Sequence, residues 1–185
     1  MSYLTYLASD YPLEEVKNPH DRLLSVNEAL ALGVKDIPEE LLAPGFDRDK
    51  PEVILCADRR VDMDLLGRVT DGDYDDDFCL TPFEEGEDVY TQKGYKVALG
   101  WHRCTRGRAE KIIEYIKENL RHTDEVELWR IWMGTDETPS IFVTTIPVNK
   151  LTPQDIYEID SRNVIEEAQR FGGLPVQYKL VIKAE

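Results

Sequence analysis

The sequence lacks the patterns that most often indicate secretion or membrane insertion. It has three cysteines, Cys56, Cys79 and Cys104, and their wide spacing forms neither a C-x-x-C pair nor a disulfide framework. No N-x-[ST] sequon occurs, and no apolar run approaches the length of a membrane span. The first residues also lack the basic start and apolar stretch of a signal peptide. We therefore expect a protein of a reducing compartment, most simply the cytoplasm.

Positive charge is scarce as well. The chain has 22 Lys and Arg against 37 Asp and Glu, which gives a formal net charge of −15. Such a surface repels phosphate backbones and anionic lipids, so we expect neither nucleic-acid nor membrane binding. Solubility alone explains the acidity, and the alternative is a surface for a basic protein partner. With 42% hydrophobic residues, the composition is that of a globular protein, and we expect a single domain over residues 1–185.

Catalytic and cofactor motifs are missing. The sequence contains no G-x-S-x-G, H-E-x-x-H, P-loop or G-x-G-x-x-G pattern. We therefore predict no catalytic residue, no metal and no cofactor. His102 and Cys104 alternate on an extended stretch and could form a thiolate site or half a zinc site, but no second pair at ligand spacing completes it. Buried thiols of the core are the simpler interpretation of the cysteines.

The pattern of secondary structure changes near residue 92. Before it, signals are short: Ser25 and Glu28 have the spacing of a capping box that begins a short helix ending at Gly33, and residues 38–42 predict one more helical turn. Residues 53–57 form an apolar run typical of a buried strand, and a further strand is expected near residue 78. These N-terminal strands should extend or cover a sheet formed by the second half.

The second half predicts six regular elements. Strands are expected at residues 95–101, 125–133, 141–148 and 176–183, and helices at 105–120 and 153–171. This β-α-β-β-α-β order is typical of the ferredoxin-like fold, an antiparallel sheet with two helices on one face. The predicted fold class is therefore α+β and ferredoxin-like, extended by N-terminal strands and a short helix. Another α+β arrangement with the same element order is the alternative.

Two tryptophans on one predicted strand point to opposite faces of the sheet. Trp132 should lie on the same face of this strand as Leu128, whereas Trp129 should lie on the same face as Ile131. One of the two should enter the core beneath the helices. The other is either covered by the N-terminal half or lies on an open face, where an aromatic side chain could bind a ligand.

The first candidate site is cationic. We expect the first and third predicted strands of the second half to run parallel, so the loops 102–105 and 149–152 that follow them should meet at one end of the sheet. Cations in the first turn of a helix oppose its dipole unless something negative lies nearby. A phosphate or carboxylate ligand is one answer, and pairing with neighbouring acids is the other. The predicted anion-binding residues are Arg103, Arg106, Arg108 and Lys150.

The second candidate site is anionic. No Lys or Arg occurs from residue 69 to residue 92, and this stretch is rich in Asp and Glu. Neither register of the Asp repeat fits an EF-hand, because Asp76 or Phe78 occupies the position that needs glycine. A looser site for a hard cation and a solvated turn are the alternatives to a surface that binds a basic partner. That predicted surface comprises Asp71, Asp73, Asp75, Asp76, Asp77, Glu84 and Glu85.

Residues 2–10, read as SYLTYLASD, and residues 24–33, read as LSVNEALALG, resemble a small bacterial family of uncharacterised proteins. The resemblance implies a bacterial cytosolic setting and brings no activity and no site residues. Two hypotheses of function follow from the residues themselves. The first is a non-catalytic acidic domain that binds a basic partner, and the alternative is a small-molecule binding protein or enzyme with an anion site at the strand-to-helix loops. A concave site would favour the alternative.

Overall fold

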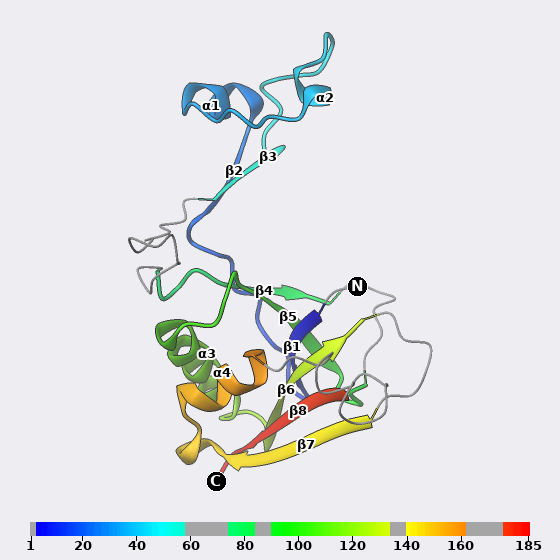
Figure 1. Ribbon diagram of the computed structural model, residues 1–185, viewed down its shortest axis with the longest axis vertical. Coiled ribbons are helices and arrows are strands. Elements are labelled where there is room, and N and C mark those ends of the chain that lie inside the picture. Colours follow the sequence, from blue (N-terminus) through cyan, green and yellow to red (C-terminus); the bar gives the residue numbers. More distant parts are fainter. Residues whose placement is uncertain (1–2, 58–73, 84–89, 134–139, 162–175) are drawn as a thin grey trace. The chain divides into compact units, whose positions relative to one another are not determined.

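The computed structural model describes residues 3–57, 74–83, 90–133, 140–161 and 176–185 (Figure 1). The chain forms two compact units, one of residues 18–73 and one of residues 1–17 together with 74–185. Each unit has its own hydrophobic core, and we describe them separately. The single domain over residues 1–185, divided near residue 92, stays a prediction.

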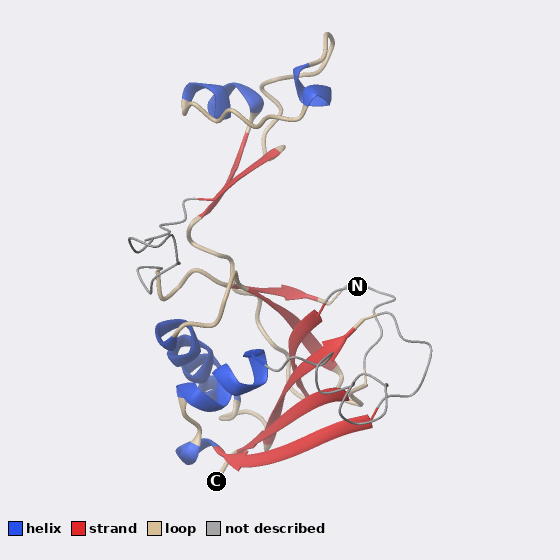
Figure 2. Cartoon of the chain, in the orientation of Figure 1, coloured by secondary structure: helices blue, strands red, loops and turns tan. Residues whose placement is uncertain are grey.

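The unit of residues 18–73 contains a two-stranded ribbon and two short helices (Figure 2). Strand β2 (Asp21–Leu24) pairs antiparallel with β3 (Ile54–Ala57), and helices α1 (Val26–Ala31) and α2 (Glu39–Leu42) lie between them in sequence. The predicted capping box is present, because Ser25 Oγ accepts from the Glu28 amide at 3.2 Å and the Ser25 amide donates to the Glu28 carboxylate at 2.7 Å. The strand predicted near residue 53 therefore pairs with β2 and does not extend the large sheet, which corrects our expectation.

The larger unit is built on a six-stranded sheet in the order β4-β5-β1-β6-β8-β7. Its strands are β1 (Tyr3–Ser9), β4 (Cys79–Pro82), β5 (Tyr95–Gly100), β6 (Glu125–Trp132), β7 (Ser140–Pro147) and β8 (Val176–Lys183). Neighbouring strands are antiparallel except β7 and β8, which are parallel. Helix α3 (Arg106–Asn119) connects β5 to β6, and a 3₁₀ turn, η1 (Val148–Lys150), and helix α4 (Pro153–Ser161) follow β7. The α+β class is confirmed, and the part of the predicted 153–171 helix beyond residue 161 lies outside the described residues.

The strand order differs from that of a ferredoxin-like sheet. There, β5 would lie between β8 and β7, whereas β5 here lies between β4 and β1. Strand β1, which the prediction left out of the sheet, occupies a central place between β5 and β6. The physical reason is that β1 is apolar on both faces, so only a position covered on both sides buries it. Strand β4 extends the sheet at its edge, as expected for the strand near residue 78.

Helices α3 and α4 lie on one face of this sheet (Figure 1), as the sequence predicted. Thr105 caps α3, with its hydroxyl accepting from the Arg108 amide, and the predicted apolar stripe of α3 faces the sheet. Alternate side chains of the sheet strands, among them Leu7, Leu128 and Leu180, complete the core beneath the helices. None of the helices in the described ranges is both long enough and apolar enough to cross a membrane.

The opposite face of the sheet is also covered. Trp129 is 1% exposed and stacks on Tyr6, with the ring centroids 5.8 Å apart and the planes 7° from parallel. Ala8 and Ile131 complete this second core, and Phe83 packs against it. Trp129 therefore does not form an open aromatic platform, because Phe83 and Tyr90 of the N-terminal half pack against this cluster.

A buried carboxylate lies on this second face. Glu127 accepts hydrogen bonds from Thr91 Oγ1 at 2.6 Å and from Trp129 Nε1 at 2.7 Å, and it forms an ion pair with Lys179. Burial by itself would raise the pKa of Glu127, but the hydrogen bonds from Lys179, Thr91 and Trp129 hold that pKa below its ordinary value. The network ties the segment around Thr91 to β6 and β8.

The lowered pKa predicts how Glu127 contributes to stability as pH changes. Its contribution is present above the ordinary pKa of 4.5 and is lost as pH falls through the lower pKa of the folded state. The substitution Glu127→Gln should therefore lower the free energy of unfolding near neutral pH by about 1–3 kcal/mol and weaken its pH dependence below that value. Urea titrations at several pH values measure both, with Glu40→Gln on exposed α2 as the control. Parallel curves for Glu127→Gln and the wild type would show that the network does not act in this way.

Candidate functional site

The four predicted anion-binding residues do not gather at one end of the sheet. The strand pairing makes β5 and β7 run in opposite directions, so the loops that follow them lie at opposite ends. Arg103 and Arg106 lie at the start of α3, whereas Lys150 ends η1 at the far end. The expected convergence of the two loops is therefore wrong, because it assumed that the strands before these loops run parallel. Anion binding by these residues stays a prediction.

Arg108 is buried in an ion pair with Asp77. Its Nη2 lies 2.8 Å from Asp77 Oδ2, and the side chains are 0% and 6% exposed. The guanidinium also donates from Nε to the Tyr74 carbonyl at 3.2 Å and from Nη1 to the Arg103 carbonyl at 2.9 Å. These bonds fasten the segment that begins at residue 74 to the first turn of α3.

Arg106, in the first turn of the same helix, is also paired with an acid. Arg106 pairs with Glu110 one turn later, with 2.9 Å between Nε and Oε1. The Asp75 side chain lies against Gly107, in the space that a Cβ atom at that position would occupy. A carboxylate beside the first turn interacts favourably with the positive end of the helix dipole. The protein itself therefore supplies negative charge close to the arginines of this turn.

The predicted acidic surface is only partly within the described residues. Asp75 and Asp76 are exposed, whereas Asp71, Asp73, Glu84 and Glu85 lie outside the described residues. Asp77 is 4% exposed and bound to Arg108, so it is not available to a partner. Throughout the described ranges, no group of three or more His, Cys, Asp or Glu side chains could hold a metal ion.

Cys104 is a buried thiol rather than a nucleophile. Burial, reinforced by the negative charge of Asp160, raises the pKa of Cys104 to about 12. The thiol is therefore protonated at neutral pH, and it donates weakly to the Thr105 carbonyl at 3.7 Å. His102, two residues earlier, is exposed at the rim of a cavity described below.

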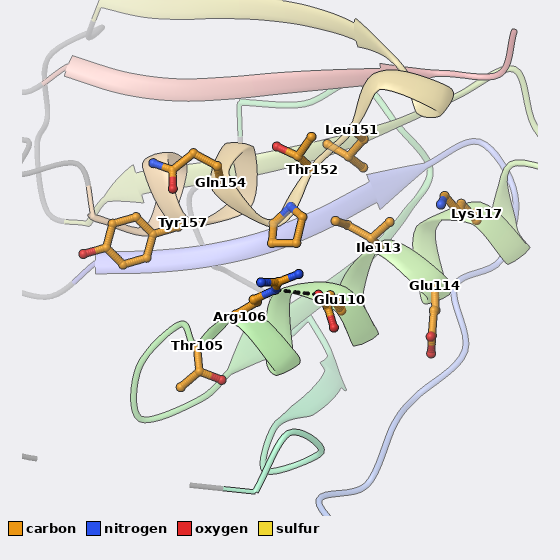
Figure 3. A pocket seen from close by; sticks show the side chains of 11 residues that line it. Thr105, Arg106, Glu110, Ile113, Glu114, Lys117, Leu151, Thr152, Gln154 and Tyr157 are labelled. Carbon is orange, nitrogen blue, oxygen red and sulfur yellow. Dashed lines mark hydrogen bonds and ion pairs between the residues drawn. The ribbon is translucent and has the colours of Figure 1, made fainter. Parts of the chain in front are cut away.

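A groove of about 600 Å³ runs between α3 and α4. Figure 3 shows Arg106, Glu110 and Ile113 on the α3 side, and Gln154 and Tyr157 on the α4 side. The Arg106–Glu110 pair is exposed to solvent, with side chains 86% and 50% accessible, and such pairs are worth little energetically. The groove therefore has apolar walls and a charged rim whose arginine is neutralised by its own helix.

A second cavity, of about 330 Å³, lies where β5 and β6 end and β1 begins. Because β1 lies between β5 and β6, the residues that line the cavity come from several elements. Unlike the groove, it contains a half-buried ion pair between β6 and α4. The cavity is lined by Tyr3, Leu4, Thr5, Leu99, Gly100, Trp101, His102, Arg130 and Asp160.

Arg130 is the central cation of this cavity. It is the cross-strand neighbour of Thr5, and its Nη1 donates to Thr5 Oγ1 at 2.7 Å and to Asp160 Oδ1 at 3.2 Å. The guanidinium carbon lies 4.7 Å from the centroid of the Tyr3 ring, in a cation–π contact. Its Nε is buried and has no hydrogen-bond partner within the part of the chain that the structure describes. One edge of the guanidinium is thus held by the protein, and the donors of the other edge are not.

Asp160 of α4 supplies the opposite charge. Its carboxylate is mostly buried, so it needs partners. Its Oδ1 accepts from Trp101 Nε1 at 3.1 Å as well as from Arg130 Nη1, and the Arg130 and Asp160 side chains are 19% and 17% exposed. Oδ2 has no hydrogen-bond partner among the described residues. The pair therefore leaves an acceptor and an adjacent donor edge without hydrogen-bond partners among the described residues.

Sequence reasoning overlooked Arg130 and Asp160, because they are 30 positions apart and form no motif. One signal was present in the sequence. Arg130 lies on the same face of its strand as Val126 and Leu128, where an apolar residue is expected. The partner of a charge placed there cannot be found without the position of α4.

Comparison with known proteins does not identify a family for this chain. The chain matches no protein-family model, and searches of curated proteins and of solved structures find no match either. The resemblance of residues 2–10 and 24–33 to a bacterial family therefore stays an expectation of the sequence. The function is therefore inferred from the geometry of the site.

The buried pair at the start of α3 gives a stability prediction. The substitution Asp77→Asn leaves the Arg108 guanidinium buried without a counter-charge, so the free energy of unfolding should fall by about 3–5 kcal/mol. Chemical denaturation measures this loss, and Asp36→Asn at an exposed position is the matched control. A loss no larger than that of the control would mean that Arg108 is not held as described.

Proposed function

We propose that this protein binds a small carboxylate-bearing molecule in the cavity around Arg130. The observation that supports this proposal is the buried Nε of Arg130. This atom has no hydrogen-bond partner among the described residues, although Nη1 of the same side chain makes two hydrogen bonds. A buried donor left unsatisfied costs about 1–3 kcal/mol. A ligand carboxylate bound to Nε and Nη2 would remove that cost through two parallel charge-assisted hydrogen bonds.

The surroundings of Arg130 support this assignment. Nη1 is tied to Thr5 and Asp160, and the Tyr3 ring lies against the guanidinium, so the cation is oriented before a ligand arrives. Preorganisation of this kind lowers the entropic cost of binding. The groove between α3 and α4 offers no comparable group, since both of its cations, Arg106 and Lys117, are exposed. The cavity thus favours the small-molecule hypothesis, at a place other than the loops that sequence reasoning chose.

The competing hypothesis of an acidic domain that binds a basic protein stays a prediction. Among the described residues it depends on Asp75 and Asp76, because Asp77 is buried and the rest of the predicted surface lies outside the described residues. Asp75 is also in contact with Gly107 of α3. The charge of −15 is explained by solubility without a partner.

Isocaproate, a branched monocarboxylate, tests the proposal. It should raise the melting temperature of the wild-type protein and shift the ¹⁵N resonance of Arg130 Nε, because binding to the native state stabilises it. The substitution Arg130→Lys keeps the charge but removes the two-donor edge, so affinity should fall by about tenfold or more. Titration followed by nuclear magnetic resonance measures both effects.

Two controls make the test specific. Isohexanol has the same carbon skeleton without the carboxylate and should not shift the Nε signal. Arg121→Lys changes an exposed arginine that pairs with Glu118, and it should bind isocaproate like the wild type. Binding of isocaproate by Arg130→Lys as tight as by the wild type would exclude the proposed function.

A further inference from the structure

We infer that the ligand of this cavity is a free α-amino acid with an apolar side chain, an inference that rests on the proposed carboxylate site. The observation behind it is that Arg130 does not face the cavity alone. Asp160 lines the same cavity, and its Oδ1 lies 3.2 Å from Arg130 Nη1. Any ligand carboxylate that reaches Arg130 therefore comes close to a second carboxylate.

The charges of the pair decide between a simple anion and a zwitterion. Arg130 and Asp160 together carry no net charge, so a simple anion gains from Arg130 and is repelled by Asp160. A ligand that carries an ammonium next to its carboxylate meets an opposite charge at both positions. In an α-amino acid one carbon atom separates these groups, which suits two protein groups that are themselves in contact.

The unused atoms of the pair match this ligand. Nε and Nη2 of Arg130 are donors for the α-carboxylate, and the Oδ2 of Asp160, which has no partner among the described residues, is an acceptor for the α-ammonium. Thr5 and Trp101 hold Nη1 and Oδ1, so the ligand does not need to break the ion pair in order to bind. Both charges of the ligand thus find groups that are already oriented.

The remaining walls indicate the side chain of the ligand. Leu99 is apolar, and the rings of Tyr3 and Trp101 also line the cavity. A volume of about 330 Å³ has room for a branched or aromatic side chain beside the two charged groups. The lining residues include no further acid, so a basic side chain would find no second counter-charge.

Three ligands with the same branched skeleton test the inference on the unmodified protein. L-leucine has both charges, isocaproate lacks the ammonium, and isoamylamine lacks the carboxylate. L-leucine should bind at least about tenfold more tightly than either analogue, because each missing charge removes a charge-assisted hydrogen bond. Calorimetric titration of the full chain gives the three dissociation constants.

The substitution Asp160→Asn gives an independent readout. Asparagine keeps an oxygen that can accept from Trp101 and Arg130, but it loses the negative charge that the ammonium needs. The preference for L-leucine over isocaproate should fall to near unity in this variant, while isocaproate binds at least as well as to the wild type. Because the preference is a ratio within one protein, it can be interpreted even if Asp160→Asn is less stable.

The outcomes separate this inference from the proposed function. If isocaproate binds as tightly as L-leucine, the carboxylate site stands and the amino-acid inference falls. If isoamylamine binds as tightly as L-leucine, or if none of the three ligands binds, both fall. A preference for L-leucine that persists unchanged in Asp160→Asn would overturn the role given to Asp160.

Discussion

The central position of β1 is the constraint on which the larger unit depends. Strand β1 pairs with β6 over residues 3–9 and with β5 over residues 6–9, and its apolar side chains on both faces must be covered. Leu7 faces the core beneath α3 and α4, whereas Tyr6 and Ala8 face the second core with Trp129. Strand β1 pairs antiparallel with both β5 and β6, so it separates these two strands and makes them parallel to each other. The centre of the sheet therefore depends on a segment of seven residues near the N-terminus.

The same strand places the cavity. Thr5 lies opposite Arg130 in the ladder, and Tyr3 lies opposite Trp132 one pair farther along the same face. Tyr3 and Trp132 meet edge to face, with 4.8 Å between ring centroids, so the ring that contacts the Arg130 guanidinium is itself packed in place. Half-buried ion pairs such as Arg130–Asp160 contribute little net stability, because desolvation offsets their attraction. The distinctive property of this pair is the donor and acceptor that it leaves unused.

Two kinds of charged group contrast within the larger unit. Arg108 uses Nε, Nη1 and Nη2 in hydrogen bonds to Tyr74, Arg103 and Asp77, and it is fully buried. Arg130 uses Nη1 alone and lines a cavity. The first arrangement is complete and fastens a loop to a helix, whereas the second is incomplete and points to a ligand. The number of arginines in a stretch of sequence does not distinguish these cases, but the count of satisfied donors does.

Local patterns in the sequence determined most of the individual elements. The capping box at Ser25, the cap at Thr105, the apolar stripe of α3 and the alternation along β6 depend on residues within one or two turns of each other, so they can be read directly. The α+β class follows from their order.

The pairing of strands, the separation of Lys150 from the start of α3 and the meeting of Arg130 with Asp160 were decided only by the tertiary structure. Each of these depends on which elements become neighbours in space, and hydrophobic burial is non-directional. The pattern of a strand shows that it must be covered, but it does not name the segment that covers it.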